Sequence, residues 1–218
     1  MSMTKAGKWL ACVAVALAGH GCGDEARAPA EPEPTLTLDV ENRLDGQLGG
    51  QGLGRFSVLD GTPDPDGSDY DLQSAQVVTS RLTGVLADIR LPIRNPLGAT
   101  APVDLQLRLL RDGREPEPDD GLVIGTASLP AAAFVGVDLT DPGTWPRFDV
   151  SGVGLQLTPG RKYCFSVSTV DTLGFVYVVE FTMNYADGGA FRRNRAQTSA
   201  WSTMADADFA FQTFVAEP

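Results

Sequence analysis

The chain has almost no histidine. Its one histidine, His20, lies in an N-terminal segment that we expect to be removed. Without an imidazole, a mature protein cannot build a Ser-His-Asp triad, a Cys-His pair or a histidine-ligated zinc site. We therefore expect a protein that is not an enzyme. The catalytic arrangement left open is a pair of carboxylates for glycoside cleavage.

Positive charge is also scarce. The 218 residues include 17 Lys and Arg against 28 Asp and Glu, which gives a net charge of -11. If Lys5 and Lys8 leave with the N-terminal segment, 15 basic residues remain and the net charge becomes -13. Nucleic acid binding depends on clustered Lys and Arg that neutralise phosphates. Nucleic acid is therefore not an expected partner.

Three cysteines are too few for a disulfide framework. Cys12 lies in the segment to be removed, so Cys22 and Cys164 remain. Cys164 alternates with Ser166 and Ser168 in the run RKYCFSVS. Little in this run would lower the pKa of the thiol, so we expect Cys164 to be buried and unreactive. A disulfide between Cys22 and Cys164 is the alternative if ordinary signal peptidase cuts the chain and Cys22 is not acylated.

Residues 1–21 have the parts of an export signal. Lys5 and Lys8 give a positive start, residues 9–19 (WLACVAVALAG) are apolar, and small residues follow. The apolar stretch has 11 residues, whereas a transmembrane helix needs about 20. We therefore expect a signal peptide and no transmembrane anchor.

Two cleavage sites compete. Residues 16–18 (ALA) form a site for ordinary signal peptidase, which would leave a soluble protein beginning at Gly19. Residues 18–22 (AGHGC) resemble a bacterial lipobox, although Gly19 stands where leucine is usual. We expect the second site, because Cys22 follows the apolar run and precedes a polar tether. An acylated Cys22 would anchor an exported lipoprotein to a membrane, facing the periplasm or the cell exterior.

Two segments of different composition follow Cys22. Residues 22–35 mix Pro, Ala and acids without a large apolar residue, which predicts an extended tether. Residues 36–218 contain no second linker and are long enough for one hydrophobic core. We therefore expect one folded domain over 36–218.

The periodicity after residue 35 is that of strands. Val103, Leu105, Leu107 and Leu109 alternate strictly with polar residues, which predicts a strand with one apolar face. Similar runs are residues 35–41, 75–81, 84–91, 122–129, 147–150, 161–170, 175–184 and 207–215. Segments rich in Gly, Pro and Asp separate these runs, so the sequence predicts an all-β sandwich or barrel. The best helical segment is a short turn in residues 130–136 (PAAAFVG).

Several short segments also appear in an order that suggests a family. They are Ala75-Gln76, residues 105–113, Phe148-Asp149, residues 157–160 before Tyr163, residues 185–189 (YADGG) and residues 208–215 (DFAFQTFV). In this order the chain resembles the jelly-roll β-sandwich domains of bacterial surface proteins called choice-of-anchor domains, which are similar in outline to carbohydrate-binding modules.

The resemblance implies a single jelly-roll-like antiparallel β-sandwich that acts as a non-catalytic binding or adhesion module, with a glycan as the default ligand. It supplies no site motif. Two alternatives stay open: a structural envelope lipoprotein that packs on a partner protein, and a carboxylate-dependent glycosidase.

An acidic loop is the sharpest local feature. Asp64, Asp66, Asp69 and Asp71 lie two to three residues apart around Gly67, and carboxylates at such spacing suit Ca²⁺. The loop is not an EF-hand, because no Glu stands at the twelfth position. The sequence predicts either a calcium site or a solvated acidic turn. A second acidic segment, residues 115–120, is expected to be an exposed hairpin tip.

Four aromatic residues in the second half of the domain could stack on sugar rings: Trp145, Tyr177, Tyr185 and Trp201. The alternative is that they are buried, as tryptophans in a sandwich of this size usually are.

Arg192, Arg193 and Arg195 form the basic cluster of an acidic protein. They predict either a loop with salt bridges to acidic neighbours or a contact for an anion or an acidic glycan.

Overall fold

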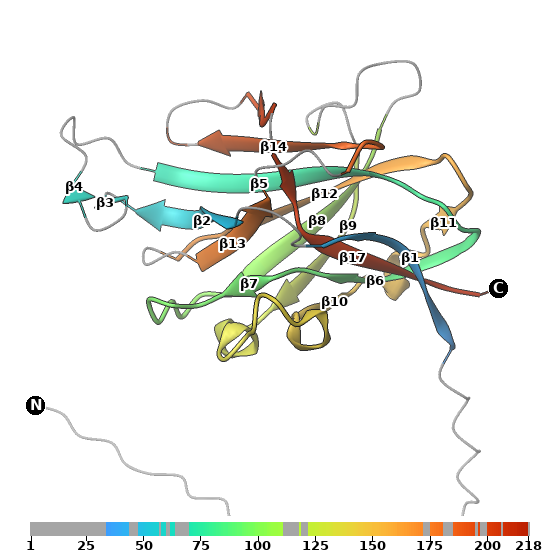
Figure 1. The fold of residues 1–218 in the computed structure, drawn as a ribbon, viewed down its shortest axis with the longest axis horizontal. Helices are drawn as coiled ribbons and strands as arrows, with labels where there is room; N and C mark the ends of the chain where they lie inside the picture. Colours follow the sequence, from blue (N-terminus) through green and yellow to red (C-terminus); the bar gives the residue numbers. More distant parts are fainter. Residues whose placement is uncertain are drawn as a thin grey trace, which may run out of the picture. The chain divides into compact units, whose positions relative to one another are not determined.

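The chain folds as two antiparallel β-sheets that pack face to face (Figure 1). A computed structural model describes residues 34–43, 48–56, 58–59, 62–63, 70–110, 118, 122–171, 175–180, 185–194, 196, 200–205 and 207–217. Of residues 48–56, 58–59, 62–63, 70 and 175–180 only the backbone is described. Residues 34–218 group as one compact unit.

The smaller sheet has five strands in the order β1-β17-β6-β10, with β11 also beside β6. Its strands are β1 (Leu36–Asn42), β17 (Phe211–Ala216), β6 (Gly84–Arg90), β10 (Arg147–Asp149) and β11 (Gln156–Leu157). The first and last long strands of the domain are neighbours, because Leu36 pairs with Ala216 and Asn42 pairs with Phe211.

The larger sheet has ten strands, seven of which follow the order β16-β13-β2-β5-β12-β8-β9. On its other side β5 pairs with β14, β14 pairs with β15, and β7 pairs with β13. The bounds are β2 (Leu48–Phe56), β5 (Tyr70–Thr79), β7 (Ile93–Arg94), β8 (Val103–Leu109), β9 (Leu122–Leu129), β12 (Lys162–Thr169), β13 (Phe175–Glu180), β14 (Gly189–Asn194), β15 (Ser202–Thr203) and β16 (Asp208–Phe209).

Short elements complete the described part of the chain. A separate two-stranded sheet consists of β3 (Val58–Leu59) and β4 (Thr62–Pro63). The 3-10 helices are η2 (Ala131–Phe134), η3 (Pro142–Thr144) and η4 (Ser151–Val153). No helix in the described ranges is long and apolar enough to cross a membrane.

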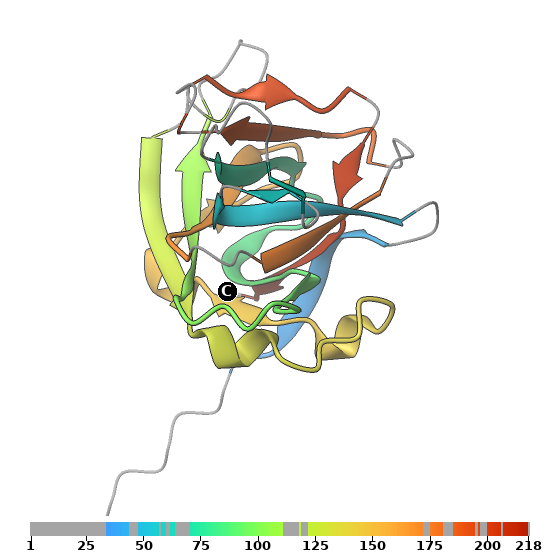
Figure 2. The same ribbon diagram turned by 90° about the vertical axis from the view of Figure 1, so that its left-hand side faces the viewer.

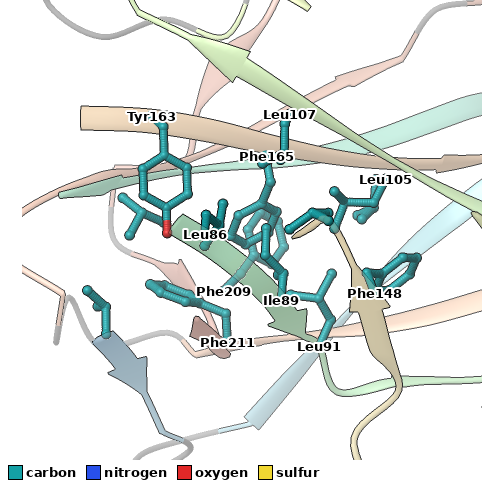
Figure 3. Close-up of a cluster of buried hydrophobic side chains, with 14 of the residues drawn as sticks. Leu86, Ile89, Leu91, Leu105, Leu107, Phe148, Tyr163, Phe165, Phe209 and Phe211 are labelled. Carbon is teal, nitrogen blue, oxygen red and sulfur yellow. The ribbon is translucent and has the colours of Figure 1, made fainter. Parts of the chain in front are cut away.

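The core lies between the sheets and is built from alternate residues of facing strands (Figure 3). On β8, Val103, Leu105 and Leu107 are fully buried, as their alternation predicts. Across the interface, the rings of Phe165 on β12 and Phe211 on β17 meet edge to face at 5.7 Å. Each large apolar side chain buried in this way contributes about 1.5 to 3 kcal/mol.

The far side of β5 and β12 is buried as well. Ala75, Val77, Cys164 and Phe191 form a second apolar cluster there, and Leu110 and Trp201 pack against it. Both faces of β5 and β12 are therefore covered where this cluster lies.

The predicted all-β sandwich is confirmed, and most of its predicted strands lie close to their observed bounds. The predicted helical turn in residues 130–136 is η2. The longer strands absent from the predicted runs are β2, which pairs with β13, and β14, which pairs with β5.

Candidate functional site

Most of the predicted calcium loop lies outside the described residues. Asp64, Asp66 and Asp69 belong to that part, whereas Asp71 lies on β5 with its side chain 7% exposed. Its backbone N–H donates to Asn194 Oδ1 at 2.8 Å. Among the described residues no group of three or more His, Cys, Asp or Glu side chains is placed to hold a metal ion. The calcium site therefore stays a prediction.

The predicted lipid anchor, Cys22, and the tether also fall outside the described part of the chain. Cys164 is a free, fully buried thiol, and its Sγ–H donates to Phe165 O at 3.4 Å. Burial raises the pKa of Cys164 to about 12, although the nearby Arg108 guanidinium acts in the opposite direction. The expectation that Cys164 is buried is confirmed, and the raised pKa disfavours the reactive thiolate.

Trp145 does not offer its ring to a ligand, because only 4% of the residue is exposed. The indole Nε1–H donates to Leu139 O at 3.2 Å. The turn before it is held by Asp141, whose Oδ1 accepts from Gly143 N at 2.9 Å and caps η3. Trp145 is therefore an anchor of the η3 loop, and of the two alternatives for this residue the structure shows the buried one.

Tyr185 is buried as well, with 4% exposed, and its ring meets Phe211 edge-on at 5.3 Å. Its hydroxyl bonds the backbone of Thr79, at the end of β5. Of the two alternatives for Tyr185, the structure therefore shows the buried one, which leaves no ring face for a sugar. Tyr177 lies on β13, where its backbone pairs with Gln51 and Ile93, and its side chain is outside the description.

Trp201 is the remaining candidate among the aromatic side chains that the structure describes. It is half-buried and packs on the outer cluster around Cys164 and Phe191. The guanidinium of Arg193, on β14, lies over its ring at 4.4 Å from the centroid. Arg193 Nε donates in turn to Gln73 Oε1, on β5, at 2.8 Å. A ring, a cation and an amide are thus held together on the outer face of the larger sheet.

The predicted basic cluster is divided by the strand. Arg192 and Arg193 are consecutive residues of β14 and point to opposite faces, Arg192 being exposed. Arg195 lies outside the described residues. Arg193 contacts the Trp201 ring and donates to the Gln73 amide oxygen, and both contacts hold its guanidinium on the outer face of the sheet.

Polar side chains continue across the same outer face, on β12 and β8. Ser166 pairs with Gln106, and Ser168 pairs with Asp104. These residues are opposite in register to the core residues of their strands. Ser166 is buried, and Asp104, Gln106 and Ser168 are half-buried. We call Trp201, Arg193, Gln73, Ser166, Ser168, Gln106 and Asp104 the outer polar face.

The sequence held part of the signal for this surface. The alternation on β8 and β12 predicts that Asp104, Gln106, Ser166 and Ser168 face away from the core. The alternation could not show that Arg193 and Trp201 lie on this face. Their position depends on the pairing of β14 with β5, and these strands are far apart in sequence.

The protein thus belongs to the class of all-β, antiparallel sandwich proteins. No protein-family model matches the chain, and a search of curated proteins found no match either.

Proposed function

We propose that this protein is a non-catalytic, surface-anchored β-sandwich module that binds a glycan through its outer polar face. The observation that carries the proposal is the half-buried Trp201 with the Arg193 guanidinium over its ring and Gln73 bonded to that guanidinium. Binding sites for small polar ligands combine apolar or aromatic surface with a few fixed polar groups. This constellation supplies both on a rigid sheet.

Its geometry favours recognition over a purely structural role for Arg193. The guanidinium is planar and has several N–H donors in a fixed fork, which matches hydroxyl and carboxylate oxygens. The bond to Gln73 and the contact with Trp201 fix the fork before a ligand arrives, so less side-chain entropy is lost on binding. Ser168, Gln106 and Asp104 add donors and acceptors for sugar hydroxyls.

A glycan array with neutral and acidic oligosaccharides tests the proposal, followed by calorimetry on any glycan that is retained. We expect Trp201→Ala to weaken binding at least roughly tenfold, or about 1.4 kcal/mol. Leu97→Ala is the matched control, because Leu97 is 64% exposed and lies outside the outer polar face. An array without a retained glycan, or equal affinities for the two variants, would contradict the proposal.

The anchoring part of the proposal rests on Cys22, which follows the apolar run and precedes the tether. We expect Cys22→Ser to move the protein from the membrane fraction to the soluble fraction. An unmodified N-terminus at Gly19, found by mass spectrometry, would contradict lipid anchoring.

Measuring the release of reducing sugar from any glycan that binds separates a binding module from the glycosidase alternative. We expect no release.

A further inference from the structure

Strand β9 forms a margin of the larger sheet. It pairs with β8 and with no other described strand, and in Figure 2 it is the outermost strand on the left, in yellow-green. Its eight residues, LVIGTASL, include no charge and no proline. Leu122 and Val123 are 72% and 43% exposed, and Thr126 and Ser128 are exposed too.

Other margins in the described part of the fold carry features that block pairing with another strand. β1 contains Asp39 and Glu41 and has an irregular register between Leu38 and Val40. β10 has three residues and two charges, and β15 and β16 have two residues each. Charges, bulges and short length are the usual protections of a sheet edge. β9 has one of them, a bulge opposite Leu107 and Arg108.

The bulge leaves most of β9 regular. Gly125 to Leu129 pair without interruption with Leu107 to Val103 of β8. Gly125 is next to η4: a Cβ at this position would lie 2.3 Å from Val153 Cγ2. The regular part is therefore a five-residue strand centred on Ala127, and η4 packs beneath its first residue.

The hydrophobic core is incompletely covered along this same margin. Eight apolar residues pack on the core while remaining partly exposed. Six of them are on β9, beside it or against it: Leu109, Ile124, Ala127, Leu129, Ala131 and Val153. An added strand at β9 would cover part of this apolar margin and would give β9 backbone groups a second partner.

We propose that β9 pairs with β9 of a second copy of this chain, antiparallel, about a twofold axis at Ala127. This pairing is self-complementary, as a twofold interface requires. Thr126 then lies opposite the partner's Ser128 on the outer face, and cross-strand pairs of hydroxyl residues are favourable. Gly125 lies opposite the partner's Leu129 on the core side, next to Val153 of η4.

Charge favours a second copy at this strand over other places on the surface. The chain carries a net charge of -11, so two copies repel each other wherever acidic surfaces meet. β9 brings no charged side chain to the pairing. The dimer joins two ten-stranded sheets into one continuous sheet. This inference does not depend on glycan binding.

Site-directed disulfide crosslinking of the full chain, purified in detergent, tests the register. In the dimer the two Ala127 Cα atoms lie about 4.5 to 5.5 Å apart, which a disulfide can span. We therefore expect Ala127→Cys to give a covalent dimer under mild oxidation, above the level that the unmodified chain shows. Val123→Cys is the control, because its two copies lie roughly 26 Å apart at about 3.3 Å per residue.

Sedimentation equilibrium of the same full chain tests the association without a crosslink. We expect the unmodified chain to have the mass of a dimer and Thr126→Lys to have the mass of a monomer. The dissociation constant of the dimer should rise at least roughly tenfold in Thr126→Lys, because lysine on an edge strand opposes pairing. Thr158→Lys, in an exposed turn, should leave the dimer intact. A monomeric unmodified chain, a dimer that tolerates Thr126→Lys with an unchanged melting temperature, or equal crosslinking of both cysteine variants would overturn the inference.

Discussion

The hydroxyl of Tyr185 bonds both backbone groups of Thr79. It accepts from Thr79 N at 2.7 Å and donates to Thr79 O at 3.3 Å. The Thr79 hydroxyl donates back to Asp187 O. Residues 185–189 (YADGG) thus fasten the end of β5, which pairs with β12 on one side and with β14 on the other. A segment that suggested a surface-protein family from its sequence has a structural role.

Removing this hydroxyl should destabilise the fold. We expect Tyr185→Phe to lower the free energy of unfolding by about 1 to 2 kcal/mol, because Thr79 loses its partner for two part-buried backbone groups. The melting temperature should fall by about 2 to 4 °C per kcal/mol. Tyr185→Ala should cost more, since it also removes the ring that meets Phe211 at 5.3 Å. Equal losses for the two variants would mean that the hydroxyl bonds carry no separate stabilisation.

Gly188 should tolerate no side chain. A Cβ there would lie 2.0 Å from Val77 O and 2.5 Å from Tyr185 Cε1, so the backbone or the Tyr185 ring must move. We expect Gly188→Ala to cost about 2 to 4 kcal/mol. Gly152→Ala is the matched control, because a Cβ at Gly152 meets nothing within 4 Å. Thermal unfolding of the two variants is the measurement, and similar midpoints would show that the end of β5 adapts to the added methyl group.

The two faces of β8 should respond differently to a carboxylate. Leu107→Asp places a charge at a fully buried position, and we expect a loss of about 3 to 5 kcal/mol. Arg108 is half-buried and donates to Pro118 O at 3.2 Å and to Gln106 Oε1 at 2.9 Å. Arg108→Asp should therefore cost about 1 kcal/mol, more than a freely solvated position would. Urea unfolding measures both, and equal losses would contradict the register of β8.

Stability should fall in alkali, in part because of Cys164. Burial raises its pKa from the ordinary 9.0 to about 12, so the unfolded chain ionises before the folded one. The stability that this thiol contributes is present below about pH 9 and is lost as the pH rises toward 12. Cys164→Ala removes this pH-dependent contribution to the free energy of unfolding.

Urea unfolding at pH 8 and at pH 10.5 tests this difference. We expect the free energy of unfolding to fall less between these pH values in Cys164→Ala than in the unmodified chain. Parallel losses in the two proteins would exclude a contribution from the thiol. A cavity left by the substitution lowers the free energy of unfolding at both pH values alike, so it does not affect the difference between them.

Sequence patterns predicted the strands that face the core on one side and polar surroundings on the other. β8 is the clearest example, because its apolar residues and its polar residues alternate without exception. β2 escaped prediction because four of its nine residues are glycine, which is depleted in strands. β2 forms because it pairs with β13. β13 lies far along the chain, and the periodicity of a sequence does not show which distant segments pair.

The residues of the proposed site were harder to predict for a related reason. Trp145 and Trp201 have similar turn-like surroundings in the sequence, yet Trp145 is buried at the end of η3 and Trp201 lies half-buried beside Arg193. Burial depends on which strands become neighbours. Only the pairing of β14 with β5 brings Arg193 to Gln73.

The pairing of β1 with β17 sets how the domain responds to mechanical force. The described chain enters the fold at β1, whose first residue pairs with Ala216 and whose last pairs with Phe211. A pull on the preceding segment along the strand axis loads the six registered pairs of this ladder together, in shear, and does not open them one at a time. A module tethered through its N-terminus would therefore resist detachment under load through the whole length of one edge strand.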